Sequence, residues 1–140
     1  MQISKERKIE LFIVGLLSLI ILSSFINFRN IHIKFHNKTG EDLDSLIVAG
    51  TLIGHLKSDG STEYIDFKEF RFDDDLPYEQ ISSIINNKKI HQLNWSWCGT
   101  GRNTKSKGSY SFDLKKQIDE KGNVCLYLVE RNKKMFWEEN

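Results

Sequence analysis

Two cysteines, four histidines and a run of three aspartates are the residues of this sequence whose types could do chemistry. The cysteines are Cys98 and Cys125, an even pair of the kind that an oxidising compartment uses as a disulfide. Closing a loop of that length would stabilise a domain by roughly 3–4 kcal/mol. Two buried free thiols are the alternative, and the sequence leaves both interpretations open.

The histidines are not spaced like metal ligands. His32 and His36 share one face of a predicted strand but lie roughly 13 Å apart along it, too far to hold one ion unaided. His55 and His91 have no cysteine or acidic partner at ligand spacing. Cys98 would need a nearby base to act as a nucleophile, and His91 falls on the opposite strand face by parity. We therefore predict no metal site, no cofactor and no catalytic residues.

Two further segments resemble ligand-binding loops only superficially. Asp73, Asp74 and Asp75 lack the surrounding pattern of a calcium loop, so a solvated turn is the prediction. Residues 98–105 (CGTGRNTK) are rich in glycine but do not end in Gly-Lys-Ser/Thr at the start of a helix. We expect a hairpin connection there and no nucleotide site.

Charge is unevenly distributed along the chain. Residues 63–79 contain seven acidic side chains, whereas residues 80–112 contain five basic ones and no acid, which predicts an acidic side and a basic side. The basic side could contact lipid headgroups, an anionic envelope polymer or an acidic protein, and an ordinary solvated face is the alternative. Its residues are Lys88, Lys89, Arg102, Lys105 and Lys107.

Residues 11–28 form an 18-residue run without a charged side chain, behind a basic tail at residues 1–10. As a helix the run would be about 27 Å long, close to the thickness of the hydrocarbon core of a bilayer. A cleaved secretory signal is the alternative, but only Ser23 and Ser24 are small where a cleavage site needs small residues. We favour an uncleaved signal anchor.

The orientation of this anchor follows from its form. Basic residues flank it equally, with Lys5, Arg7 and Lys8 before it, so the charge count is a tie. A short basic tail before an apolar run is typical of an export signal, and a long following domain translocates largely regardless of its charge. We expect the N-terminus in the cytoplasm and residues 29–140 outside, in a bacterial envelope, because the richness in Ile, Lys and Asn is typical of AT-rich bacterial genomes.

Residues 29–140 read as one mainly β domain. Alternation of apolar and polar residues predicts about seven short strands in an antiparallel sandwich or small barrel, with a bend near Lys68. Residues 124–129 are apolar on both faces and should form a central strand. The predicted strands lie within residues 31–35, 46–49, 51–56, 64–72, 91–97, 110–114 and 124–129.

One short helix is predicted after Asp75, because Pro77 suits a first turn and Tyr78, Ile81 and Ile85 recur at helical spacing. The tryptophans of residues 91–97 share the parity of an apolar leucine, which favours core packing over an exposed stacking platform.

These features favour a class of function over a specific activity. Residues 29–140 carry 17 basic and 17 acidic residues, and this neutrality argues against nucleic-acid binding. The leading hypothesis is a membrane-anchored, non-catalytic binding or assembly module outside the cytoplasmic membrane, for which an immunity-type protein is one specific form. A small envelope enzyme with an unrecognised site is the alternative.

Overall fold

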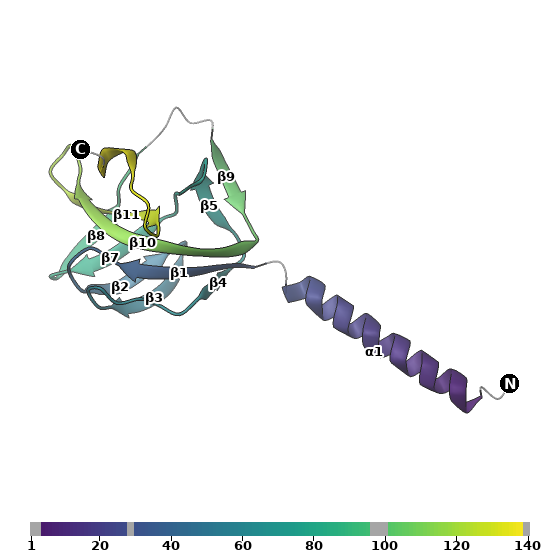
Figure 1. Cartoon of the computed structure of the whole chain (residues 1–140). Helices are drawn as coiled ribbons and strands as arrows, with labels where there is room; N and C mark the ends of the chain where they lie inside the picture. Colours follow the sequence, from purple (N-terminus) through teal and green to yellow (C-terminus); the bar gives the residue numbers. More distant parts are fainter. Residues whose placement is uncertain (1–3, 28–29, 96–100, 139–140) are drawn as a thin grey trace.

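The computed structural model describes residues 4–27, 30–95 and 101–138, and it places one long helix before a β domain (Figure 1). The helix, α1, spans Lys5–Asn27, and a short 3-10 helix, η1, spans Phe136–Glu138. The strands are β1 (Ile31–Asn37), β2 (Leu43–Val48), β3 (Thr51–Leu56), β4 (Ile65–Phe67), β5 (Phe70–Asp73), β6 (Leu76–Pro77), β7 (Ile81–Ile85), β8 (Lys88–Gln92), β9 (Arg102–Lys105), β10 (Gly108–Ile118) and β11 (Val124–Glu130).

Helix α1 is long and apolar enough to cross a membrane. Its candidate membrane span, Lys5–Phe25, buries none of its side chains inside the protein. The serine hydroxyls within it donate to the helix's own carbonyl groups, as Ser18 Oγ does to Val14 O at 2.6 Å and Ser24 Oγ to Ile20 O at 2.9 Å. These bonds satisfy the hydroxyl donors within the helix. A hydrocarbon environment requires this, because it offers no other hydrogen-bond partner.

The mainly β fold that the alternation predicts is confirmed, as a curled eight-stranded sheet and a small three-stranded sheet (Figure 1). The large sheet has the order β3-β2-β7-β8-β11-β10-β1-β4, and the small one β6-β5-β9. The predicted antiparallel arrangement is only partly right, because β1 pairs with β10 and β8 with β11 in parallel. Those two pairs join segments far apart in sequence, so no hairpin signal could reveal them.

The main core lies on the concave side of the curled sheet, and the small sheet contributes two rings to it. Phe70 and Phe72 of β5 pack against Phe112 of β10, with ring centroids 5.7 and 6.1 Å apart. All three side chains are at most 1% exposed. The predicted bend near Lys68 is confirmed, because β4 belongs to the large sheet and β5 to the small one.

A second apolar cluster lies on the outer face of β11. Cys125, Tyr127 and Val129 point into it, whereas Leu126 and Leu128 point into the main core. Strand β11 is therefore buried on both faces, as its sequence predicts. The segment after β11 folds back over the outer face and places Met135 and Trp137 in the same cluster.

The helix predicted after Asp75 is wrong, because residues 76–77 and 81–85 form β6 and β7. Ile81, Ser83 and Ile85 are buried in alternation. The segment therefore follows the two-residue period of a strand, although its isoleucines also have helical spacing. The physical reason lies in the following turn. Asn86 and Asn87 both have positive φ, 49° and 63°, which closes a tight hairpin from β7 into β8.

The strand predicted at residues 91–97 is displaced. Strand β8 begins at Lys88, inside the hairpin, and ends at Gln92. Leu93 still donates its backbone N–H to Leu126 O at 2.6 Å, and Trp95 packs in the outer cluster with only 9% of its surface exposed. Core packing of Trp95 is thus confirmed, whereas Trp97 lies outside the described residues.

Candidate functional site

The small sheet brings the acidic and the basic segments of the sequence together. Strands β5 and β9 pair in antiparallel register, with Asp73 opposite Arg102 and Phe70 opposite Lys105. Lys105 Nζ lies 3.2 Å from Asp75 Oδ1 and 4.4 Å from the centroid of the Phe72 ring. The prediction of separate acidic and basic sides is therefore wrong for this region, because strand pairing places opposite charges on neighbouring strands.

Arg102, unlike Lys105 of the same strand, has no acidic partner among the described residues. Its guanidinium carbon lies 5.0 Å above the centroid of the Tyr78 ring, a cation–π contact, and it forms no ion pair with any residue that the structure describes. By contrast, Arg71 on β5 is neutralised by the buried carboxylate of Glu79, through bonds of 2.9 and 2.7 Å to Oε1. Arg71, Tyr78 and Arg102 line a small depression of about 130 Å³.

The other predicted basic residues lie elsewhere. Lys88 and Lys89 begin β8 beside the tight turn, and both are exposed. Lys107 is exposed directly before β10. Figure 1 shows the turn between β7 and β8 at the opposite end of the domain from β9. The five basic residues therefore do not form one contact surface.

Asp73 is buried, contrary to the predicted solvated turn. Its side chain is 0% exposed, and neither carboxylate oxygen has a hydrogen-bond partner among the residues described. Only the next two aspartates fit the prediction, since Asp74 has a turn conformation with φ 53° and the Asp75 side chain is 97% exposed. Burial of a carboxylate without a hydrogen-bond partner is costly.

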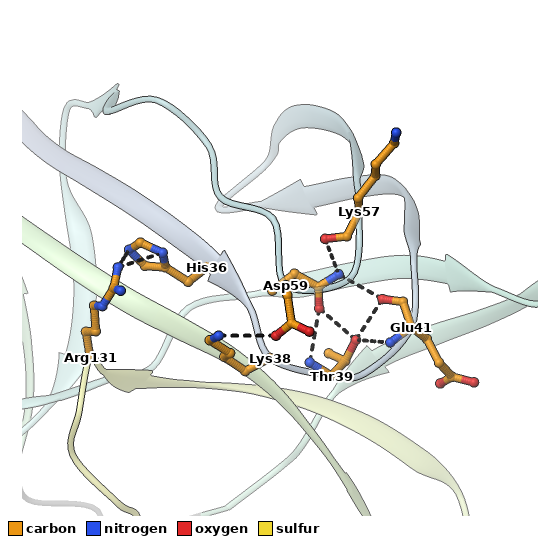
Figure 2. A network of polar contacts seen from close by, with 8 residues as sticks. His36, Lys38, Thr39, Glu41, Lys57, Asp59 and Arg131 are labelled. Atoms are coloured by element: carbon orange, nitrogen blue, oxygen red, sulfur yellow. Dashed lines mark hydrogen bonds and ion pairs between the residues drawn. The ribbon is translucent and has the colours of Figure 1, made fainter.

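A polar cluster on β1, β10 and the segment after β11 is the arrangement nearest to a catalytic site, and Figure 2 shows two of its members, His36 and Arg131. His36, 7% exposed, has Nε2 at 2.8 Å from Ser111 Oγ. The guanidinium nitrogen Nη1 of Arg131 lies 2.9 Å from Nδ1 and 2.7 Å from Nε2 of the same ring. Asp113, opposite His36 in the strand register, is also buried.

These surroundings keep the imidazole of His36 neutral. Burial lowers its pKa from 6.5, the positive charge of Arg131 lowers it further, and the Asp113 carboxylate opposes them only in part. A guanidinium can only donate hydrogen bonds, so it also favours the unprotonated ring. A neutral His36 could accept a proton from Ser111, but Arg131 would then repel the imidazolium, which disfavours use of His36 as a general base.

The turn after β1 has a structural role (Figure 2). Asn37, 0% exposed, donates from Nδ2 to the carbonyl oxygens of Glu41, Leu56 and Lys57 at 2.8, 3.0 and 3.1 Å. Its Oδ1 accepts from the Thr39 hydroxyl at 2.7 Å. Every polar atom of this buried amide is satisfied, so the turn is a hydrogen-bonded junction that fixes the end of β1 to β3.

An open cleft of about 440 Å³ lies next to the outer cluster. Two indole rings form part of its wall, those of Trp95 and Trp137, whose centroids are 5.9 Å apart. Its polar lining includes Asp119, which accepts backbone N–H bonds from Lys121 and Asn123 at 2.9 and 2.8 Å and has its pKa lowered by them, that of Asn123 most. The Asp119 carboxylate thus serves to hold its own turn through these hydrogen bonds.

The cysteines and the other histidines complete the predicted candidates. Cys125 lines the same cleft, and burial followed by the nearby Asp119 carboxylate raises the pKa of its thiol. Its predicted disulfide partner, Cys98, lies outside the described residues, so the pairing stays a prediction. His32 and His55 each contact one carboxylate, Asp66 and Asp44 respectively. The described part of the chain contains no group of three side chains placed to hold a metal ion.

Comparison with known proteins gives little further information. No family model matches the chain, and no curated protein matches it. Among solved structures, it is similar to the NMR structure of a protein from Eubacterium rectale, with a TM-score of 0.47 and 10% sequence identity over 76% of this chain and 94% of that chain. A likeness this remote carries no argument about function.

Proposed function

We propose that this chain is a membrane-anchored, non-catalytic binding or assembly module on the outer face of a bacterial cytoplasmic membrane. The observation that carries the proposal is α1, an apolar helix with none of its apolar part buried, which only residues 28–30 separate from β1. A helix in water would bury its apolar side chains against the domain, so a bilayer is the environment that suits this one.

The orientation and the kind of partner belong to the same proposal. The basic tail, residues 1–10, whose Lys5, Arg7 and Lys8 lie in the first turns of α1, remains in the cytoplasm, and the domain is exported. An immunity-type role, in which the domain neutralises a toxin at the membrane, needs only a small anchored surface with a few available charges. The depression beside Arg102 and Tyr78 supports such a role, because Arg102 is exposed, stacks on the Tyr78 ring and has no ion-pair partner among the described residues.

Membrane extraction tests the anchor. We expect the full chain to stay in the membrane pellet after carbonate washing. Leu16→Arg combined with Ile20→Arg should release it, because an arginine at the centre of a spanning helix costs about 2.5–3.5 kcal/mol. Ser18→Ala is the matched control and should stay in the pellet. Release of the unchanged chain by carbonate would reject the anchor.

The contact of Ser111 with His36 favours a second candidate, a small envelope enzyme that uses a serine nucleophile. Against it stands the repulsion between Arg131 and a protonated His36 ring. A serine-reactive phosphonate probe separates the candidates. Labelling that is lost in Ser111→Ala would support the enzyme, and equal labelling of both proteins would remove it.

A further inference from the structure

Two exposed lysines lie on either side of the chain where it leaves the domain toward α1. Phe67 of β4 and Gly108 of β10 both pair with Ile31, the first residue of β1. Because β4 runs antiparallel to β1, Lys68, which follows Phe67, lies beside the residue that precedes Ile31. Because β10 runs parallel to β1, Lys107, which precedes Gly108, lies beside the same residue on its other side.

The connector holds this edge of the domain close to the end of the helix. Strand β1 begins at Ile31 and α1 ends at Asn27, so even a fully extended connector spans only about 14 Å. The polar headgroup layer on each side of a bilayer is roughly 5–8 Å thick. A lysine side chain adds several ångströms of reach, so both ammonium groups can lie at the level of the lipid phosphates.

The two lysines are electrostatically available. Neither forms an ion pair with a residue that the structure describes, and both are exposed. The two acidic residues that flank Lys68 in sequence, Asp66 and Glu69, have other surroundings. Asp66 contacts His32, and Glu69 lines a separate depression with Arg71 and Glu79.

We propose that Lys68 and Lys107 bind the phosphate groups of anionic lipids and so hold the β domain against the membrane surface. This inference rests on the proposed function, because it requires α1 to span the bilayer. A basic residue near an anionic surface favours contact by about five-fold, so the pair shifts the balance between docked and free domain by roughly thirty-fold. The effect weakens with salt, as the Debye length shortens to about 8 Å at 0.15 M.

The test uses the full chain in nanodiscs that carry a gadolinium-chelate headgroup lipid, with paramagnetic relaxation of the Lys68 and Gly108 amides as the readout. The enhancement should be greater with phosphatidylglycerol than with phosphatidylcholine alone, and salt should reduce it. Lys68→Glu with Lys107→Glu should abolish the difference between the lipids. Lys88→Glu with Lys89→Glu, the same change of charge in another part of the domain, should preserve it.

The outcomes separate this inference from the anchor. Equal enhancement in both lipids, or equal values for the two charge-reversed variants in phosphatidylglycerol, would overturn the headgroup contact while leaving the anchor in place. Failure of the full chain to resist carbonate extraction would instead reject the anchor itself. A contact that persists in pure phosphatidylcholine and in high salt would show that phosphate charge does not hold the domain.

Discussion

At the scale of the single residue, the protonation of His36 links the fold to pH. Its pKa in the folded protein lies below the ordinary value of 6.5, so the unfolded chain binds the proton more readily. The stability due to the neutral ring is present above about pH 6.5 and is lost as the pH falls toward the folded-state pKa.

We therefore expect the free energy of unfolding to decrease between pH 7 and pH 5, and to decrease less steeply in His36→Gln. Chemical denaturation at a series of pH values measures both slopes. His91→Gln, at an exposed position of β8, is the control and should keep the slope of the unchanged protein. Parallel curves for the unchanged protein and His36→Gln would contradict the assignment.

Asp73 gives a second prediction at this scale. Replacing its unpaired buried carboxylate with the neutral amide in Asp73→Asn should raise the free energy of unfolding at pH 7 by about 1–3 kcal/mol. Asp75→Asn, at a side chain that is 97% exposed, should change it by no more than about 0.5 kcal/mol. Thermal denaturation measures both. A destabilised Asp73→Asn variant would show that the carboxylate has a stabilising partner.

At the scale of the element, the turn at Asn86 and Asn87 determines that β7 and β8 form a hairpin. Asn87→Ala should destabilise the domain by roughly 1–2 kcal/mol, because alanine is strained at the positive φ of 63°. Asn87→Gly should be neutral or slightly stabilising, since glycine adopts this conformation freely. Urea denaturation distinguishes the two, and an alanine variant as stable as the glycine variant would disprove the role of the turn.

Trp95 gives the corresponding prediction for the outer cluster. Trp95→Ala should cost about 3–5 kcal/mol, because the ring is buried between Tyr78 and Trp137 at centroid distances of 5.0 and 5.9 Å. Fluorescence-monitored unfolding can measure this loss. A loss below about 1 kcal/mol would mean that the ring serves as a binding platform and not as core.

Local patterns predicted some elements well and others poorly. Strand β1 could be predicted because its apolar and polar residues alternate, and β11 because it is apolar on both faces. Strand β7 was missed because Ile81 and Ile85, four residues apart, fit both helical and strand spacing. The Asn86-Asn87 pair was the signal that could have decided for the hairpin.

The candidate sites depend on contacts that local patterns cannot show. Arg131 meets His36 across 95 positions of sequence, and β5 meets β9 across 29 to 35 positions. The sequence therefore indicated which residues carry charge but not that Lys105 would be paired with Asp75 while Arg102 would remain available. Only the pairing of strands distributes the five basic residues over different parts of the domain.

At the scale of the whole molecule, the proposed function depends on α1 as an anchor and on export of the domain behind it. In the proposed anchored state, the short connector keeps the edge of the domain that carries Lys68 and Lys107 near the lipid. If the domain were instead cytoplasmic, the predicted disulfide would not form in that reducing compartment.

Fusion reporters after Asn140 test this central claim most directly. We predict that alkaline phosphatase, which folds only outside the cytoplasm, is active there, and that a fluorescent protein that matures only in the cytosol remains dark. Expression of both fusions, checked by immunoblot, is the control. A bright fluorescent fusion together with an inactive phosphatase would contradict the proposed location and orientation of the whole domain.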